Sequence, residues 1–295
     1  MRHDVIVVGG SYAGMAASLQ LLRARRSVLV IDAGLRRNRF ATHSHGFLGQ
    51  DGVGPADVAA RARRQLEAYP TLTWIEGTAA AVEGQRDGFT VTGDDGQVHQ
   101  ARRILLATGV SDRLPPIEGL AERWGRSAFH CPYCHGYELE EGPIGVIGVG
   151  PTSLHQAELL TEWGEVTFFL NGALELDADA RRALQARKVI LEEGRIERIE
   201  EAADVLLGDG RRISLAGLFI ATRTVPSSSL PEEIGCELED TPTGIQVRLD
   251  ESRQTSIPGV FACGDVARMP HSISLAVGDG AMTGIHVHRS LVWPD

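Results

Sequence analysis

Two cysteines separated by two residues are the part of this sequence best suited to chemistry. They are Cys131 and Cys134, within the segment FHCPYCHGYE. A thiol pair at this spacing can close a small disulfide ring, or it can supply half of a tetrahedral metal site. A zinc site needs a second pair of ligands at similar spacing, whereas Cys236 and Cys263 stand alone. The spacing therefore favours a redox-active dithiol, and we predict no metal.

A histidine lies beside each of these cysteines. His130 directly precedes Cys131, and His135 directly follows Cys134. Because imidazole titrates near neutral pH, either ring can take up and release the proton of a thiol. We take His135 as the acid–base candidate, and His130 stays open as the alternative.

The chain begins with the pattern of a dinucleotide site. An apolar, β-branched run at 4–8 predicts a buried parallel strand, and the turn GGSYAG and a helix follow it. The next strand, 27–32, ends in Asp32, whose carboxylate suits ribose hydroxyls. Ser11 replaces the middle glycine of the G-x-G-x-x-G pattern. The residues predicted to bind the cofactor here are Gly9, Ser11, Tyr12, Ala13, Gly14, Asp32 and Ala33.

Three more segments are expected to contact the same cofactor. An apolar strand at 102–110 ends in a small-residue turn, and the strand near residue 260 delivers an acid to a turn. The loop 37–52 follows the second strand, where it can fold over the cofactor. The candidates in these segments are Ala107, Thr108, Gly109, Gly264, Asp265, Asn38, His43 and His45.

A second strand–turn–helix–strand pattern begins at residue 142. It runs through a strand (144–147), the turn Gly148-Val149-Gly150, a helix from Thr152 and a strand (166–170). Ser153 stands at the third-glycine position, and the last strand leads into Asn171 in place of an acid. Two Gly-rich units in one chain describe a flavoprotein with FAD on the first unit. The second unit would hold NADPH or NADH, and its degenerate pattern makes such binding doubtful.

These units predict an α/β fold with two three-layer, Rossmann-like domains, the second inserted into the first. We expect a discontinuous FAD-binding domain over 1–112 and 245–295. Residues 113–244 would form a pyridine-nucleotide-like domain that carries the C-x-x-C. The expected crossings are the proline-containing stretches 111–120 and 241–246.

The composition agrees with a two-domain enzyme. The chain has 295 residues, against about 150 residues per domain. A net charge of −10 without a Lys/Arg-rich tract argues against nucleic-acid or membrane-surface binding. No apolar run approaches the ~18 residues of a membrane helix. Four cysteines are too few for a secreted disulfide scaffold, so we expect a cytoplasmic protein.

The order of the motifs GGSYAG, LLATG, C-P-Y-C, GVGPTS and TSIPGVFACGD resembles that of the low-molecular-weight thioredoxin reductases. The resemblance covers nearly the whole chain and implies an FAD-dependent disulfide oxidoreductase that forms a homodimer. It further implies that Cys134 faces the flavin and that Cys131 exchanges with substrate.

Three elements depart from that family. His135 stands where the reductases have an aspartate, LNGALELDADARR replaces their HRRxxxR element, and residues 270–273 (PHSI) replace their RQA element. The stretches RNRFATHSHGFLGQDG (37–52) and CPYCHGYE instead resemble the branch of the gliotoxin and holomycin dithiol oxidases.

That branch implies oxidation of a small dithiol to a disulfide, with electrons passing through FAD to oxygen. The alternative is an NADPH-dependent reductase of a thioredoxin-like protein, and a second alternative is a non-catalytic flavin redox sensor. The HRRxxxR element holds the 2′-phosphate of NADPH in the reductases, so its replacement favours the oxidase.

Overall fold

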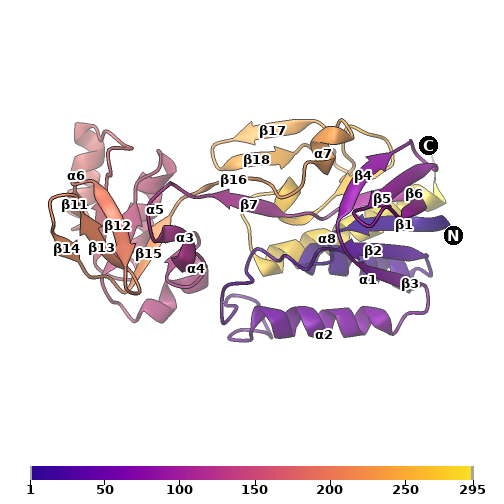
Figure 1. Cartoon of the computed structure of the whole chain (residues 1–295), viewed down its shortest axis with the longest axis horizontal. Helices are drawn as coiled ribbons and strands as arrows, with labels where there is room; N and C mark the ends of the chain where they lie inside the picture. The colour runs from indigo at the N-terminus through magenta and orange to yellow at the C-terminus, as the bar shows by residue number, and fades with distance from the viewer. Residues whose placement is uncertain (1, 294–295) are drawn as a thin grey trace. The chain divides into compact units, whose positions relative to one another are not determined.

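The computed structural model describes residues 2–293 and shows two compact units. Unit 1 comprises Met1–Arg39, Pro55–Ser111 and Thr224–Asp295, and unit 2 comprises Phe40–Gly54 and Asp112–Arg223. Figure 1 shows the elements of both.

The unit boundaries differ from the domain boundaries expected from the sequence. The chain returns to unit 1 at Thr224, well before 241–246, because Thr224 pairs with Gly244 in a sheet of unit 1. Residues 40–54 group with unit 2, where Phe40 lies beside Gly125. Both differences come from long-range pairing that composition does not reveal.

A mostly parallel sheet forms the centre of unit 1. Its strands run in the order β3-β2-β1-β6-β5-β4, with β19 also paired to β6. The bounds are β1 (Arg2–Val8), β2 (Val28–Asp32), β3 (Leu72–Glu76), β4 (Ala79–Glu83), β5 (Phe89–Gly93), β6 (Val98–Leu106) and β19 (Val260–Ala262). Ile6 and Val8 of β1 share a core cluster with Val82 of β4 and Val91 of β5. The intervening residues of β1 point to the other face, as the alternation of a strand requires.

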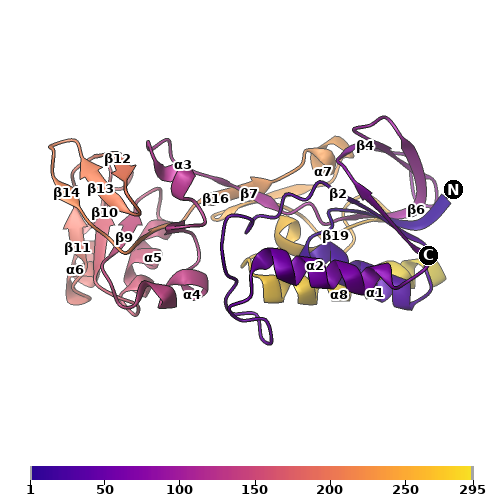
Figure 2. The same ribbon diagram turned by 60° about the horizontal axis from the view of Figure 1, so that its bottom comes forward.

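Three helices cover that other face of the parallel strands (Figure 2). They are α1 (Tyr12–Arg23), α2 (Pro55–Glu67) and α8 (Ile273–Val292). Two short helices, α7 (Leu230–Glu233) and η2 (Gly264–Ala267), complete the unit. A second sheet has the order β17 (Leu238–Thr241), β18 (Gly244–Val247), β16 (Arg223–Pro226) and β7 (Val110–Arg113). Within residues 2–293, no helix has the length and apolar character needed to cross a bilayer.

Unit 2 is built around a parallel sheet with the order β11-β10-β9-β15-β8. These strands are β8 (Ala128–Phe129), β9 (Ile144–Ile147), β10 (Val166–Phe169), β11 (Ile190–Glu192) and β15 (Gly217–Ile220). Its helices are α3 (Leu120–Arg123), α4 (Pro132–His135), η1 (Tyr137–Leu139), α5 (Thr152–Leu160) and α6 (Ala178–Ala186). A smaller antiparallel sheet contains β12 (Ile196–Glu200), β13 (Asp204–Leu207) and β14 (Arg212–Ile213).

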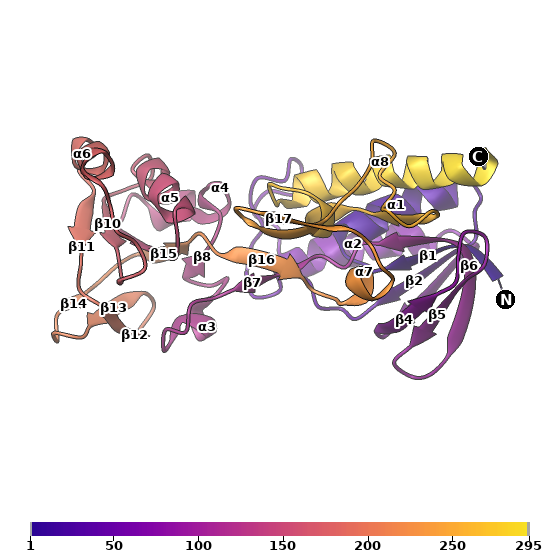
Figure 3. The same ribbon diagram turned by 90° about the horizontal axis from the view of Figure 1, so that it is seen from above.

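The side chains of this sheet divide between two cores. Phe168 of β10 packs with Ala157 of α5, whereas its neighbour Phe169 packs with Val205 and Leu207 of β13. Helices α5 and α6 therefore cover one face, and β12–β14 cover the other (Figure 3). The structure confirms the predicted α/β class with two Rossmann-like, three-layer units.

A fully buried arginine fixes the end of α8 to β6. The Arg103 guanidinium donates to the carbonyl of Ser290 over 2.7 Å, to its hydroxyl over 3.0 Å, and to Asp87 Oδ1 over 3.0 Å. Burial lowers the pKa of Arg103, and the bond to Asp87 opposes that effect. These bonds satisfy a cation whose side chain has no exposed surface.

Replacing this cation tests how much the anchor stabilises unit 1. We expect Arg103→Met to lower the free energy of unfolding by about 2–3 kcal/mol, because it leaves buried acceptors without donors. Urea denaturation measures the change. The matched control is Arg102→Met, since Arg102 also pairs with Asp87 but is partly exposed. Equal losses in both variants would contradict a special role for Arg103.

Candidate active site

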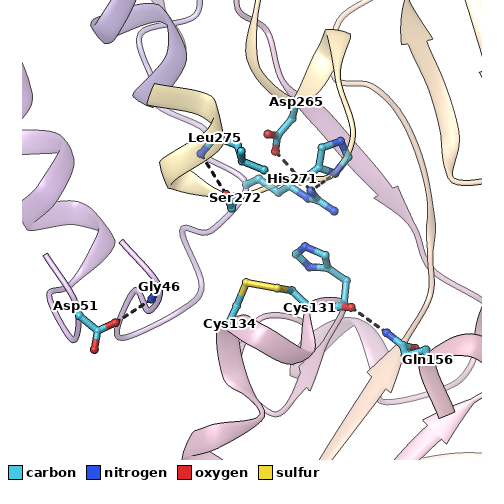
Figure 4. Close-up of a disulfide and its surroundings, with 11 residues drawn as sticks. Gly46, Asp51, Cys131, Cys134, Gln156, Asp265, His271, Ser272 and Leu275 are labelled. Carbon is cyan, nitrogen blue, oxygen red and sulfur yellow. Dashed lines mark hydrogen bonds and ion pairs between the residues drawn. A yellow bond between two sulfur atoms is a disulfide. The ribbon is translucent and has the colours of Figure 1, made fainter. Parts of the chain in front are cut away.

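Cys131 and Cys134 are joined by a disulfide at the start of α4, with their Cα atoms 5.3 Å apart (Figure 4). Cys131 is the N-cap residue in an extended conformation, and Pro132 occupies the first turn. Proline suits this position because its φ is already helical and its missing N–H would have no helical partner. The Cys134 N–H donates to the Cys131 carbonyl over 3.2 Å. The sequence C-P-Y-C therefore brings the two sulfurs together by local folding alone.

His135, the last residue of α4, stacks on Phe129. The ring centroids are 4.2 Å apart and the ring planes lie at 19°. Burial is the main cause that lowers the pKa of His135 to about 4, and a smaller electrostatic contribution from His45 acts in the same direction. Taking an imidazolium out of water costs free energy, so burial favours the neutral ring. At neutral pH His135 is an uncharged base.

His130 is held differently. Its carbonyl accepts a hydrogen bond from Gln156 Nε2 over 2.8 Å, which ties the segment before the disulfide to α5 (Figure 4). Its ring lies near Trp124, with centroids 6.3 Å apart. Both histidines thus have defined aromatic neighbours, and for His135 burial lowers the pKa and favours the neutral ring.

The glycine turn of unit 1 allows β1, α1 and the end of β6 to approach closely. Gly9 has φ +102°, and a Cβ there would lie 2.3 Å from the Ala107 carbonyl oxygen. A Cβ on Gly14 would lie 1.9 Å from the Gly9 carbonyl oxygen. Asp32, at the end of β2, accepts a hydrogen bond from the Gly10 N–H over 2.9 Å. The turn is therefore a cradle that only glycine permits at both outer positions.

A cavity of about 630 Å³ opens beside this cradle. Its lining includes Asp32 and Ala33, as the sequence predicts for a nucleotide site. The sequence did not indicate two others, Trp74 and Arg63, whose guanidinium lies 4.7 Å from the Trp74 ring centroid. Trp74 belongs to β3, which pairs with β2. The strand that comes after Asp32 in the sequence was therefore the feature that could have indicated Trp74.

Several buried polar atoms near the cradle have no hydrogen-bond partner within residues 2–293. Thr108 Oγ1 and Asn38 Oδ1 are two of them. The Asn38 amide nitrogen donates to the Tyr12 hydroxyl over 3.2 Å, and that hydroxyl contacts the Pro55 carbonyl at 3.1 Å. Buried polar atoms usually have partners, so these two indicate a polar ligand at the cradle. The predicted residues Tyr12, Asn38 and Thr108 are thus brought together with the glycine turn.

The turn at Gly264 is held by a carboxylate that sequence reasoning missed. Buried Asp279 of α8 accepts the Gly264 N–H over 2.8 Å and pairs with Arg253 at 2.5 Å. In the sequence, Asp279 is the one acidic residue in the small-residue run AVGDGAMTG. Because a charged side chain on a buried helix face needs partners, this pattern could have indicated its role.

Asp265 in the same turn lies 3.5 Å from Arg37 Nη1. That nitrogen also contacts His271 Nδ1 at 2.7 Å (Figure 4). Because guanidinium only donates hydrogen bonds, His271 accepts at Nδ1 and carries its proton on Nε2.

Two further predicted cofactor residues belong to unit 2. His43 and His45 belong to the segment Phe40–Gly54 of unit 2, the unit that holds the disulfide. Their rings are 6.4 Å apart, and His45 Nδ1 lies 3.3 Å from Glu138 Oε1. The structure therefore groups these two with α4 and η1 in unit 2, and their contact with a cofactor stays a prediction.

The second glycine turn is internally bonded. The Val149 N–H donates to the hydroxyl of buried Ser153 over 3.0 Å. Asn171, after β10, accepts the Ile196 N–H at its side-chain oxygen over 2.9 Å. Of the arginines that follow, Arg181 pairs with Glu193 at 3.0 Å and Arg182 pairs with Asp179. The Val149 N–H, the Asn171 side-chain oxygen and the guanidinium groups of Arg181 and Arg182 thus already have partners.

With this geometry established, comparison with known proteins identifies the family. Residues 3–280 match the family described as pyridine nucleotide-disulphide oxidoreductase. The chain belongs to this family.

Curated relatives of this pyridine nucleotide-disulphide oxidoreductase carry the name thioredoxin reductase. One is tcpT of Claviceps purpurea, 32% identical over 95% of this chain and 92% of the relative. Another is aclD of Aspergillus oryzae, 30% identical over 99% of this chain and 97% of the relative.

Solved structures agree with the fold. An oxidoreductase from Agrobacterium tumefaciens is 53% identical and covers 100% of both chains, with a TM-score of 0.98. The structure of HlmI is 37% identical over 98% of this chain and 92% of the other, with a TM-score of 0.90. The predicted resemblance is confirmed, and the pyridine nucleotide-disulphide oxidoreductase is a thioredoxin reductase-like flavin enzyme.

The family implies flavin and nucleotide binding, and unit 1 fits such a group. The glycine cradle, the cavity beside Asp32 and the unpartnered Thr108 and Asn38 oxygens supply space and polar contacts.

The neutral state of His135 can be tested directly. We expect NMR titration of this pyridine nucleotide-disulphide oxidoreductase to give His135 a pKa of about 4. Phe129→Ala should raise that pKa towards the ordinary ~6.5 by admitting water, and His45→Gln should raise it less, because burial is the larger cause. A wild-type pKa near 6.5 would contradict the buried, neutral ring.

The same shift sets a stability trend. An unfolded histidine takes up its proton near pH ~6.5, whereas folded His135 resists protonation until about pH 4. Protonation of His135 therefore leaves the free energy of unfolding unchanged above about pH 6.5. As the pH falls from there towards 4, the unfolded chain takes up this proton first, and the free energy of unfolding decreases.

Proposed function

We propose that this protein is an FAD-dependent oxidase of a small dithiol, with oxygen as the final electron acceptor. The observation that carries the proposal is the closed Cys131–Cys134 disulfide at the start of α4, the helix that ends in the neutral, partly buried His135. A disulfide is the oxidised partner that a substrate dithiol needs, and an uncharged imidazole is ready to accept the thiol proton.

The two cysteines divide the exchange between them. A substrate thiolate attacks Cys131, the Cys131–Cys134 bond breaks, and Cys134 leaves as a thiolate. The second substrate thiol then attacks the mixed disulfide, which releases the cyclised substrate and the Cys131 thiolate. Two electrons have passed from substrate to the enzyme dithiol. His135 holds a proton released by the substrate.

Residues of unit 1 would hold the cofactor. The Gly9–Gly14 turn and Asp32 suit the pyrophosphate and adenosine ribose of FAD, and Trp74 offers a flat apolar surface in the neighbouring cavity. The Asp265 carboxylate suits the hydroxyl groups of a ribityl chain, which can donate to it. When bound, FAD supplies a two-electron acceptor that oxygen can reoxidise.

The second unit supports oxygen over NADPH as the electron partner. Selection of a 2′-phosphate needs free arginines that can make charge-assisted bonds. Arg181 and Arg182 instead pair with acids, and the Val149 N–H already donates to Ser153.

A second candidate function is NADPH-dependent reduction of a thioredoxin-like protein. The names of the curated relatives favour it. In that direction the dithiol would reduce a protein disulfide, with His135 supplying a proton. Homodimerisation and a cytoplasmic location stay predictions of the sequence.

Cysteine variants test the proposed chemistry. The isolated protein is expected to be yellow and to release FAD, which anaerobic dithiothreitol should bleach. Cys131→Ser and Cys134→Ser should each abolish that bleaching, because neither can form the disulfide that accepts electrons. Cys236→Ala is the matched control, since Cys236 is a buried, unpaired thiol. Absorbance at the flavin band gives the rate.

Full turnover in either serine variant would remove the dithiol from the mechanism. A wild-type protein that bleaches once without aerobic turnover would instead indicate a redox sensor.

Reduction by nicotinamide nucleotides separates the two enzyme candidates. We expect NADPH to reduce the flavin slowly, with little preference over NADH, because a bidentate phosphate contact is missing. Loss of such a contact is worth on the order of 1.5–3 kcal/mol, or ~10–150-fold in affinity. Stopped-flow bleaching with each nucleotide measures this, and dithiothreitol is the positive control. Rapid bleaching by micromolar NADPH but not NADH would make thioredoxin reduction the better assignment.

A further inference from the structure

The segment that carries the disulfide also carries two exposed aromatic side chains. Tyr133 lies between the two cysteines and is 72% exposed, and Tyr137, the first residue of η1, is 84% exposed. By contrast, Phe129, Phe168 and Phe219 of the same unit are buried. Two large rings left in water close to a reactive bond form an apolar patch, which is typical of a binding surface.

The backbone places both tyrosines next to the disulfide. Gly136, between α4 and η1, has φ −69° and ψ −36°, so the chain stays helical from one element to the next. The Gly136 N–H donates to the Pro132 carbonyl over 2.7 Å, which continues the helical bonding. Residues three and four apart are neighbours on a helix surface. Tyr137 follows Cys134 by three residues and Tyr133 by four, so it neighbours both.

Trp163 forms a fixed wall beside this helix. Its ring meets the Tyr133 ring edge to face, with centroids 5.2 Å apart and planes at 89°. A Cβ on Gly136 would lie 2.8 Å from Trp163 Cδ1, so glycine is needed for this close approach. Trp163 also packs against the core cluster that contains Leu160 and Phe168. The core therefore holds Trp163, and Trp163 orients Tyr133 while most of the tyrosine side chain stays in water.

A substrate that exchanges with the disulfide must lie over the C-P-Y-C segment. Its sulfur becomes covalently bonded to Cys131, so the atoms next to that sulfur lie within a few bonds of this segment. Tyr133 and Tyr137 offer large apolar surfaces there. An aromatic ring gains from covering such surface, and it gains further from offset-stacked or edge-to-face contact with another ring. A planar apolar group beside the two thiols would therefore strengthen binding.

We propose that Tyr133 and Tyr137, with Trp163 behind Tyr133, form an aromatic platform that binds a planar apolar ring of the substrate. The proposal rests on the proposed dithiol oxidation and narrows its substrate class to small dithiols that carry an aromatic ring. The platform determines specificity by binding: it holds the two thiols at the disulfide and takes no part in the bond changes. The rings supply the contact, so the tyrosine hydroxyls are dispensable.

Two dithiols with different substituents test the platform. Dithiothreitol and o-xylene-α,α′-dithiol oxidise to cyclic disulfides of the same ring size, and only the second carries an aromatic ring. Anaerobic stopped flow gives the second-order rate constant of flavin reduction by each, and the selectivity is the ratio of the aromatic to the non-aromatic value. We expect Tyr133→Ala and Tyr137→Ala each to lower this selectivity by about 5- to 20-fold. The rate constant for dithiothreitol should change by less than about two-fold, because dithiothreitol has no ring to lose contact.

Matched variants separate the ring from the rest of the side chain. Tyr133→Phe and Tyr137→Phe keep the ring and should keep the wild-type selectivity. Ile190→Ala removes an apolar side chain that is 58% exposed on β11, at the opposite edge of the sheet from β8, and should also leave the selectivity unchanged. FAD content and unfolding temperature are measured for every variant. If Tyr133→Ala, which loses the contact with Trp163, fails to fold, Tyr137→Ala provides the same test.

The outcomes are distinct. A wild-type flavin that dithiothreitol does not bleach, or that bleaches equally in Cys131→Ser, would refute the proposed function. Normal bleaching with alanine variants that slow both dithiols equally, or neither, would overturn the platform alone. So would loss of selectivity in the phenylalanine variants, or a preference for a reduced protein dithiol over the aromatic one. Selectivity that is lost with alanine and kept with phenylalanine supports the platform.

Discussion

Backbone contact between the first and last helices is the constraint on which unit 1 depends. A Cβ added to Gly280 would lie 2.1 Å from the Ala13 carbonyl oxygen, and one on Gly284 would lie 2.6 Å from the Ala17 carbonyl oxygen. Helices α1 and α8 can approach this closely only because their facing residues are small. Gly264 extends the same contact, since its added Cβ would meet the Ala13 Cβ at 2.7 Å. The contact joins the two ends of the chain into one nucleotide site.

This contact explains why the residues expected to hold the cofactor come from distant parts of the sequence. The glycine turn precedes α1, and the Gly264–Asp265 turn precedes α8, so packing of the helices aligns the turns. Asp279 strengthens the alignment from inside α8, because its carboxylate accepts the Gly264 N–H and neutralises Arg253. Ala13, expected to contact a cofactor, has a visible role in this helix packing. A site made this way needs the whole of unit 1 to be folded.

Local patterns predicted much of this structure. The strand over 144–147 has the expected bounds, the helix from Thr152 begins where expected, and the C-x-x-C closes the disulfide that its spacing permits. Each of these depends on neighbours within a few residues. The return of the chain at Thr224, the pairing of His45 with Glu138 and the Trp74 wall of the cavity were not predicted. They depend on strand order and loop docking, and a single sequence carries no direct signal for such contacts.

The two nucleotide-type turns show how one fold can lead to different chemistry. In unit 1, Gly9 and Gly14 keep the turn open, and the Thr108 and Asn38 oxygens have no partner within residues 2–293. In unit 2, Ser153 satisfies the Val149 N–H and Asn171 satisfies the Ile196 N–H. A ligand at the second turn would have to break those bonds before making its own, and each exchanged bond yields little net free energy. The same strand–turn–helix arrangement thus suits the expected cofactor in unit 1, whereas in unit 2 the turn is bonded internally.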